Sequence, residues 1–233
     1  MEYLFLSAVS GERLISMTGK ILEGLGVSAV IFVLTLLFAL PLGFVVAAGR
    51  MSKRRPVRWF FQLFISVMRG TPLMLQLFIW YFCPYYLFNI SLSDLAVFGI
   101  EYRYSAVIIG FSLNYAAYFS EIYRAGIESI PRGQYEAGQV LGMTKTQIFF
   151  KVVLMQVVKR ILAPMSNEVI TLVKDTALAR VIMIVELIQA AQNYAAYGLM
   201  WPLFYTAVFY LIFVGILSLL FGYFEKKLDY YRV

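Results

Sequence analysis

The sequence predicts an all-α integral membrane protein with about five membrane-spanning helices. Of its 233 residues, 61% are hydrophobic and only 14% are charged, and the mean hydropathy is +0.77. These values lie outside the ordinary range of soluble proteins. Several stretches also reach the length of about 20 apolar residues that a helix needs to cross the hydrocarbon core. Because the chain shows no internal repeat, low-complexity tract or linker, we expect residues 1–233 to form a single transmembrane domain.

Residue usage limits the chemistry of the chain. It has no histidine and one cysteine, Cys83, which excludes histidine-based metal sites, Ser-His-Asp triads and internal disulfides. The net charge of +7 does not indicate nucleic-acid binding, because the basic residues flank apolar stretches and do not form one face of a soluble body. We therefore expect no catalytic residue, no metal, no cofactor and no nucleic-acid partner.

The chain is expected to begin with a surface arm and then to cross the membrane. Residues 1–20 have an acidic start at Glu2 and a short apolar run, so they do not match a signal peptide. We interpret them as a retained, partly amphipathic arm at the membrane surface. Residues 25–49 carry no charge and form the first predicted crossing. Pro41 and Gly43 are its expected kink points.

Four further crossings follow. The second covers residues 59–88, is interrupted by the sequence Arg69-Gly70-Thr71-Pro72, and ends in an aromatic belt typical of a bilayer interface. The third covers residues 104–122. The fourth covers residues 161–185, after a polar segment, and the fifth covers residues 200–223.

The basic residues orient these crossings. Most lysines and arginines fall after the first crossing, between the third and fourth crossings, and at the C-terminal end, whereas only Arg13, Lys20 and Arg103 fall on the opposite side. Cytoplasmic loops of membrane proteins are enriched in lysine and arginine. We therefore expect an external N-terminus and a cytoplasmic C-terminus, with the polar segment in the cytoplasm.

That polar segment, residues 134–155, is predicted to form two short helices joined by a tight turn. Residues 134–141 favour a helix, and Gly142 suits the left-handed position that ends one. Thr144 and Gln147 have the spacing of a capping box that starts the next helix. A rigid helix lying along the membrane can transmit a rigid-body movement from a partner protein. The alternative is a plain connecting loop.

At these residues the sequence resembles the EAA loop of bacterial ABC importer permeases. The resemblance rests on Glu136-Ala137-Gly138, on Gly142 after three intervening residues, and on the pair Val152 and Leu154. Gly138 replaces the usual second alanine. Met155 stands where proline is usual, which bears on the bend into the fourth crossing.

The resemblance covers most of the chain beyond the arm and extends to the polar amino-acid uptake subfamily. Its further motifs are Arg69-Gly70-Thr71-Pro72, residues 116–127, Gly133-Gln134 and residues 166–178. It implies a type I ABC importer permease fold in the bacterial inner or plasma membrane. It also implies a cytoplasmic ATPase, a second permease subunit (identical or homologous) and an extracellular or periplasmic binding protein. The implied ATPase-coupling residues are Gln134, Glu136, Ala137, Gly138, Gly142 and Met143.

Polar residues at membrane depth are the candidate substrate site. A charge at mid-membrane costs about 2.5–3.5 kcal/mol on insertion scales and indicates a function. Arg69 has two interpretations. It extends to the interface, or it belongs to a helix break whose exposed backbone lines a cavity.

The fourth crossing carries a denser polar cluster. Glu168, Thr171 and Asp175 are spaced by three and four residues and share one helix face. The carboxylates of Glu168 and Asp175 could bind the ammonium of an amino acid, and Lys174 could bind its carboxylate. The alternative is a closed Glu168–Lys174–Asp175 network that only joins helices. The candidate substrate-binding residues are Glu168, Asp175, Lys174, Thr171, Asn114 and Arg69.

Three functions compete for this sequence. The first is a permease subunit of an ATP-driven importer of polar amino acids. It requires a separate ATPase, because the chain has no G-x-x-x-x-G-K-[ST] motif. The second is a secondary transporter or channel subunit for small polar solutes, which five crossings without a repeat do not favour. The third is a membrane enzyme, which would have only carboxylate or lysine chemistry.

Overall fold

The computed structural model describes residues 11–96 and 99–229, and within them the chain is helical without extended strands. The all-α prediction is therefore confirmed. In chain order the elements are α2 (Gly11–Arg50), α3 (Arg55–Gly70), α4 (Leu73–Phe88), α5 (Tyr102–Glu128), α6 (Arg132–Val140), α7 (Lys145–Ile148), a π-helical turn (Phe149–Val153), α8 (Leu154–Asp175), a 3₁₀ helix (Thr176–Ile182), α9 (Leu187–Ala195) and α10 (Trp201–Leu228).

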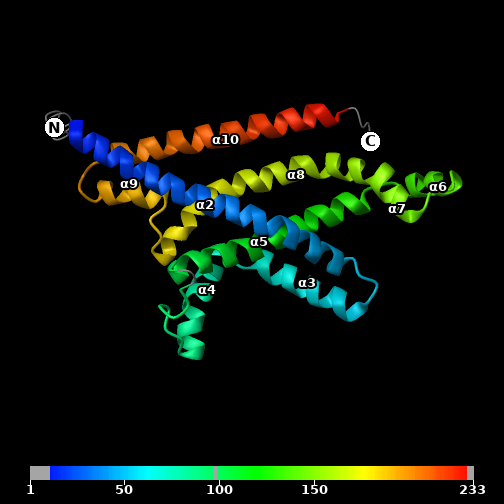
Figure 1. Ribbon diagram of the computed structural model, residues 1–233, viewed down its shortest axis with the longest axis horizontal. Helices are drawn as coiled ribbons and strands as arrows, with labels where there is room; N and C mark the ends of the chain where they lie inside the picture. Colours follow the sequence, from blue (N-terminus) through cyan, green and yellow to red (C-terminus); the bar gives the residue numbers. More distant parts are fainter. Residues whose placement is uncertain (1–10, 97–98, 230–233) are drawn as a thin grey trace.

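Helix α5 lies at the centre of the molecule. It contacts α2, α3, α4 and α8 (Figure 1). Phe111, Tyr115 and Phe119 of α5 are fully or almost fully buried in the main core. Small residues such as Ala116 and Ala117 are buried on the same helix. They let neighbouring helices approach closely, as small residues commonly do in membrane helix packing.

Helix α2 runs unbroken from Gly11 to Arg50. At 1.5 Å per residue it is about 60 Å long, roughly twice the thickness of the hydrocarbon core. Pro41 and Gly43, the expected kink points, lie inside it without interrupting it. The expected arm, residues 1–20, falls partly within α2, and residues 1–10 lie outside the described residues.

Two helices are long and apolar enough to cross a membrane by length and composition, Ile15–Arg50 and Trp201–Leu228. The pair α3 and α4 would be a third span, but it is bent by 107° at its break. The predicted second crossing is thus a bent pair of helices. The predicted third and fourth crossings correspond to α5 and α8. The α-helix of the fourth ends at Asp175, and a 3₁₀ helix replaces it as far as Ile182.

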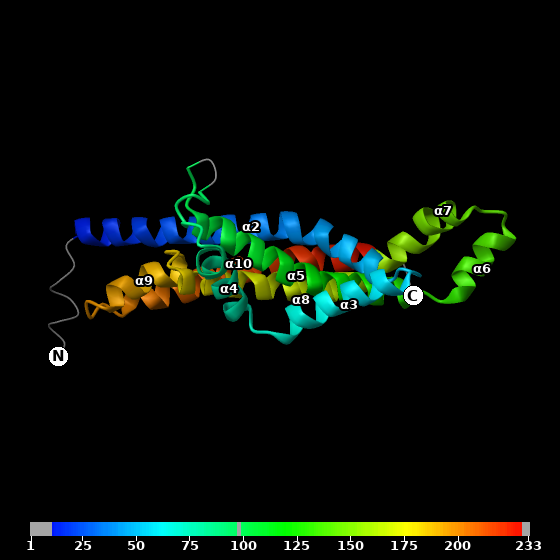
Figure 2. The same cartoon turned by 90° about the horizontal axis from the view of Figure 1, so that it is seen from below.

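The two ends of the molecule differ in their elements. Figure 2 places α6 and α7 at one end of the long axis, and α9 with the start of α2 at the other. The turn between α2 and α3 and the C-terminal end of α10 lie toward the α6–α7 end (Figures 1 and 2). We call this the α6–α7 end.

Replacing Gly43 by valine should destabilise the protein, because α2 and α5 touch at this point. A Cβ added at Gly43 would lie 2.9 Å from the Cβ of Phe119 and 3.2 Å from the carbonyl oxygen of Ala116. Overpacking of this kind costs about 1–3 kcal/mol. We expect Gly43→Val to lower the midpoint of thermal unfolding of the detergent-purified protein. Gly26→Val is the matched control in the same helix, because a Cβ there meets nothing within 4 Å; equal midpoints would contradict this account.

Candidate functional site

The break between α3 and α4 is held open by two buried amide side chains. Gly70 and Pro72 end α3, because proline disfavours a helical residue before it. The carbonyl oxygen of Met68 then accepts hydrogen bonds from Gln76 Nε2 at 2.9 Å and from Asn114 Nδ2 at 3.0 Å. Asn114 Nδ2 also lies 3.0 Å from Gln76 Oε1. The amide pair therefore satisfies backbone groups that a continuous helix would have satisfied itself.

This break bears on the two interpretations of Arg69. The structure contains the helix break that the second interpretation requires, and Arg69 lies beside it in the last turn of α3. The side chain of Gln76 also lies within hydrogen-bonding distance of the carbonyl and hydroxyl oxygens of Thr71, at 3.2 and 2.8 Å. The hydroxyl of Thr71 in turn donates to the carbonyl of Val67 at 2.8 Å. The irregular backbone is thus fixed in position and is not a loose loop.

A cavity of about 510 Å³ lies against this break. We call it the break cavity. It falls in the size range of ligand pockets, about 300–1,000 Å³. Three elements contribute the polar and aromatic side chains of its wall: Arg69 and Thr71 from the break, Asn114, Tyr115 and Tyr118 from α5, and Glu168, Thr171 and Asp175 from α8.

Five of the six predicted substrate-binding residues line the break cavity: Arg69, Asn114, Glu168, Thr171 and Asp175. The sixth, Lys174, is exposed and is not part of this wall. Successive helix residues are about 100° apart, so Lys174 and Asp175 point in different directions. In the described part of the chain, Lys174 forms no ion pair within 4 Å with Glu168 or Asp175. The closed network that was the alternative interpretation is therefore not formed.

Hydrogen bonds distinguish the roles of these residues. Asn114 is buried, and its amide nitrogen is used at the break, so it positions the cavity wall. Asp175 Oδ2 accepts a hydrogen bond of 2.7 Å from the buried Tyr115 hydroxyl. The Thr171 hydroxyl donates to the carbonyl of Asn167 at 2.9 Å and keeps its lone pairs as acceptors. Glu168 accepts no hydrogen bond from any described residue.

Tyr115 and Tyr118 also belong to this wall, although they were not among the predicted substrate-binding residues. The signal was their spacing: Tyr118 lies four residues after Asn114 and three after Tyr115, so it neighbours both on the helix surface. The guanidinium of Arg69 lies 5.0 Å from the centre of the Tyr118 ring, within cation–π distance. The break cavity thus contains two carboxylates and one cation. This set can bind both ends of a zwitterion, with the carboxylates at the ammonium and Arg69 at the carboxylate.

The polar segment 134–155 forms the helix–turn–helix that the sequence predicts. Gly142 has a φ of +72°, the left-handed conformation expected after a helix. The capping box is present, with Thr144 N donating to Gln147 Oε1 at 2.9 Å and Gln147 N to Thr144 Oγ1 at 3.3 Å. The chain then passes through the π-helical turn into α8, and Met155 lies in the first turn of that helix.

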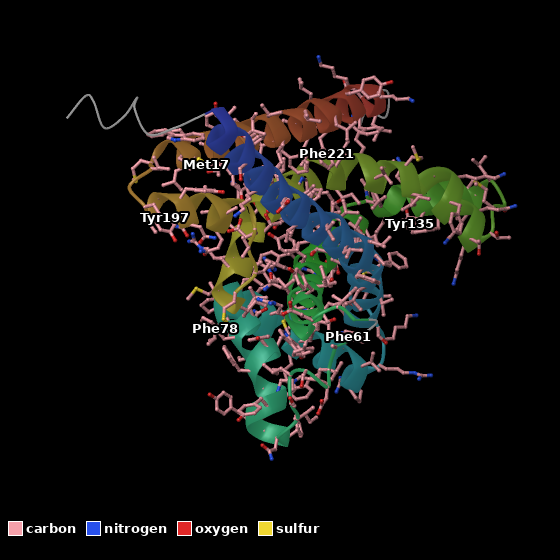
Figure 3. The ribbon with its side chains drawn as sticks, turned by 60° about the vertical axis from the view of Figure 1, so that its left-hand side comes forward. Met17, Phe61, Phe78, Tyr135, Tyr197 and Phe221 are labelled. Carbon is pink, nitrogen blue, oxygen red and sulfur yellow. The ribbon has the colours of Figure 1, made fainter. Side chains whose placement is uncertain are left out.

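Most of the predicted coupling residues lie on the surface of this segment. Gln134, Glu136, Ala137 and Gly142 are exposed, Met143 is half-buried, and Gly138 is buried. A Cβ at Gly138 would lie 2.6 Å from Ile148 Cγ1, so the glycine lets α6 pack closely on α7. Figure 3 shows Tyr135 of α6 on the opposite side of the molecule from Tyr197.

An apolar surface accompanies these polar residues. Val140 and Leu141, at the end of α6, are 88% and 78% exposed. Exposed apolar groups beside polar ones are typical of a protein-binding surface. We call the exposed residues Gln134, Glu136, Ala137, Val140, Leu141 and Gly142 the α6 surface.

Comparisons with known proteins agree with this geometry. Residues 39–230 match the family model described as "Binding-protein-dependent transport system inner membrane component". The chain is 41% identical over 203 residues to the L-cystine transport system permease protein TcyB of Bacillus subtilis, which covers 85% of this chain and 82% of that protein. It is 37% identical over 210 residues to the arginine transport system permease protein ArtQ of Bacillus subtilis, covering 89% of this chain and 92% of that protein.

Two solved structures share the fold. One is an amino acid ABC transporter crystallised with histidines, with a TM-score of 0.80 and 27% identity, covering 94% of this chain and 99% of that one. The other is the MetNI methionine ABC transporter in an inward-facing conformation, with a TM-score of 0.67 and 18% identity over the same shares. At that identity the second comparison supports the fold alone.

Replacing Gln76 by leucine should destabilise the break. The substitution leaves buried backbone and amide groups without partners, and each unsatisfied group costs about 1–3 kcal/mol. We expect Gln76→Leu to lower the midpoint of thermal unfolding in detergent by several degrees. Gln62→Leu is the matched control, because Gln62 is exposed on α3. An unchanged midpoint for Gln76→Leu would show that the amide pair does not hold the break.

Proposed function

Because the chain belongs to the family of binding-protein-dependent transport system inner membrane components, we propose that it is the permease subunit of an ABC importer that moves a polar amino acid into the cytoplasm. One observation carries the substrate part of this proposal. The wall of the break cavity contains two carboxylates, a guanidinium and the Thr171 hydroxyl. It lies at an irregular piece of backbone between apolar helices. Non-helical backbone at membrane depth is tolerated where it lines a cavity.

The substrate class follows from the charges in the break cavity. Glu168 and Asp175 bind the ammonium group, and Arg69 binds the carboxylate, so a zwitterion is favoured over an ion of one sign. Thr171 supplies a further acceptor, and Asn114 holds the wall. Lys174 lies outside this wall, and we place it outside the site. The relatives named for L-cystine and arginine transport support an amino acid as the substrate.

The partner that supplies energy binds the α6 surface in this proposal. Gln134, Glu136, Ala137 and Gly142 are exposed there, and Val140 and Leu141 add apolar contact area. Gly138 and Met143 are less exposed and support this surface through packing. Gly138 lets α6 pack closely on Ile148. A cytoplasmic ATPase seated on this surface would move a rigid helix pair. A secondary transporter or channel would leave the α6 surface without a partner.

In this proposal the α6–α7 end of the molecule faces the cytoplasm. Arg50 ends α2 near this end, and Lys226 and Lys227 lie in the last turn of α10 near it as well. This arrangement follows the rule that cytoplasmic segments are rich in lysine and arginine. The N-terminus is then external, and residues 1–20 begin outside as part of one transmembrane domain in the bacterial cell membrane.

Two further proteins complete the importer. A few helices enclose little volume, so a second permease subunit, identical or homologous, is proposed to face this one across a two-fold axis normal to the membrane. An external binding protein is proposed to deliver the amino acid at the end that carries α9. The remaining exposed apolar side chains face the lipid bilayer.

Reversing the charge of Glu136 tests the ATPase partner. We expect Glu136→Lys to reduce uptake and substrate-stimulated ATPase activity about tenfold or more, equivalent to about 1.4 kcal/mol of lost interface free energy. Both are measured in proteoliposomes that contain the permease with its ATPase. Glu225→Lys is the control, because Glu225 is an exposed carboxylate on α10 at the same end of the molecule but is not part of the α6 surface. If uptake and ATPase activity survive Glu136→Lys, the α6 surface does not bind the ATPase.

Neutralising Glu168 tests the substrate site. A charge-assisted hydrogen bond contributes about 1.5–3 kcal/mol, so Glu168→Gln should raise the KM for uptake roughly tenfold or more. Competition of uptake by acidic, neutral and basic amino acids identifies the substrate class. Glu23→Gln is the control, because Glu23 is an exposed carboxylate near the opposite end of α2. An unchanged KM for Glu168→Gln would place the substrate elsewhere.

A further inference from the structure

We infer that the contact between Arg69 and Tyr118 is the barrier between the break cavity and the cytoplasm, and that it opens when a substrate carboxylate replaces the tyrosine ring as the partner of Arg69. This inference rests on the proposed function, because it assigns a barrier to the proposed substrate site. Four observations carry it.

First, a second cavity of about 450 Å³ lies next to the break cavity. We call it the end cavity. Glu121, Arg124 and Ser129 from the last part of α5 and Arg160 from the first part of α8 line it. Its wall therefore carries charged side chains next to apolar ones such as Ile122 and Ile161.

Second, the end cavity extends from the break cavity toward the α6–α7 end. In α8, Arg160 lies eight residues before Glu168, which is about 12 Å along the helix axis. In α5, Ser129 lies eleven residues after Tyr118, about 16 Å along that axis. Helix α6 follows Ser129 by only a few residues. The end cavity thus occupies the depth between the proposed substrate site and the proposed ATPase surface.

Third, the two cavities share three wall residues: Arg69, Tyr118 and Glu168. Each of the three comes from a different helix: α3, α5 and α8. Arg69 and Tyr118 also contact each other, with the guanidinium 5.0 Å from the ring centre. The wall that the two cavities share therefore consists of this pair and the Glu168 carboxylate.

Fourth, the cations in this region differ in how firmly they are held. Arg124 is bound by two carboxylates, at 2.6 Å from Glu121 and 2.6 Å from Glu128. The Arg160 guanidinium donates to the carbonyl of Ser129. The Arg69 guanidinium instead forms no ion pair within 4 Å with a described carboxylate, because Glu121 and Glu168 act on it only at longer range. Its direct contact is the neutral Tyr118 ring, which is a weaker partner than a directly bonded carboxylate.

This difference gives the barrier its selectivity. An amino acid in the break cavity brings a carboxylate, and a charge-assisted bond to that carboxylate is stronger than a cation–π contact. Arg69 then leaves the ring, and Tyr118 is free to move. Arg124 and Arg160 remain in place, because their own partners are charged or backbone acceptors. The wall of the end cavity is therefore kept while the barrier opens.

The single cysteine of the chain makes a thiol-labelling experiment direct. In the Cys83→Ser background, Thr171→Cys places a reporter thiol in the break cavity and Ala125→Cys places one in the end cavity. The permease is expressed with its ATPase, and inside-out membrane vesicles are treated with a charged, membrane-impermeant methanethiosulfonate. We expect fast labelling of Ala125→Cys and slow labelling of Thr171→Cys.

Substitutions at Tyr118 then test the barrier. Tyr118→Ala removes the ring and should raise the labelling rate of Thr171→Cys about tenfold or more, whereas Tyr118→Phe keeps the ring face that binds a cation and should leave the rate unchanged. Saturating amino acid substrate should also raise the labelling rate of Leu73→Cys, a second break-cavity reporter outside the proposed substrate contacts, with Tyr118 intact. The labelling of Ala125→Cys, measured in parallel, shows that each variant is folded and inserted.

The outcomes separate this inference from the proposed function. Equal Thr171→Cys rates in the Tyr118 variants would overturn the barrier, and so would equal acceleration by Tyr118→Ala and Tyr118→Phe, while uptake by the parent chain would still support the importer. Labelling of Ala125→Cys only from the external side would overturn the barrier as well, and it would also reverse the proposed orientation.

Discussion

A helix that stops inside a membrane must still satisfy its backbone polar groups, and the rest of the structure depends on how this chain meets that constraint. The hydrocarbon core offers no water, so each unsatisfied group would be costly. Gln76 and Asn114 supply the missing donors at the end of α3 and join the break to α5. The bend of 107° between α3 and α4 then leaves the break cavity beside it. The cavity and the polar side chains in its wall follow from this pair of amides.

Helix α5 connects the break cavity with the α6–α7 end of the molecule. Asn114, Tyr115 and Tyr118 lie at the break cavity, and the C-terminal end of the same helix leads through Ser129 into α6. Helix α8, which packs against α5, runs back from the polar segment 134–155 to Glu168 and Asp175. A displacement of α6 and α7 therefore has two continuous helices through which to reach the cavity. The polar segment 134–155 is kept rigid by the close packing of Gly138 on Ile148 and by the capping box. A rigid segment is needed if its displacement is to reach the cavity.

The features that the sequence predicts well are those with local causes. The capping box of Thr144 and Gln147, the left-handed Gly142 and the break at Gly70 and Pro72 each depend on residues within one or two turns. The common face of Glu168, Thr171 and Asp175 also follows from helical spacing alone. The 107° bend, the use of Asn114 at the break and the bond from Tyr115 to Asp175 depend instead on packing between distant segments. Lys174 was assigned to the site because of its positive charge and its place in the polar cluster. Its direction relative to Asp175 leaves it outside the cavity wall.

The buried Glu186 differs in its hydrogen bonds from the half-buried Glu168 and Asp175. Glu186 is fully buried, and its carboxylate caps α9 by accepting from the backbone N–H groups of Ile188 and Gln189, each at 2.8 Å. Its charge is thus compensated by the helix N-terminus itself, and no acceptor is needed elsewhere. Glu168 has no such partner among the described residues, and Asp175 has one, the Tyr115 hydroxyl. Because burying a charge without compensation is costly, the acceptors left open at Glu168 and Asp175 are the ones that a cationic group of a substrate can complete.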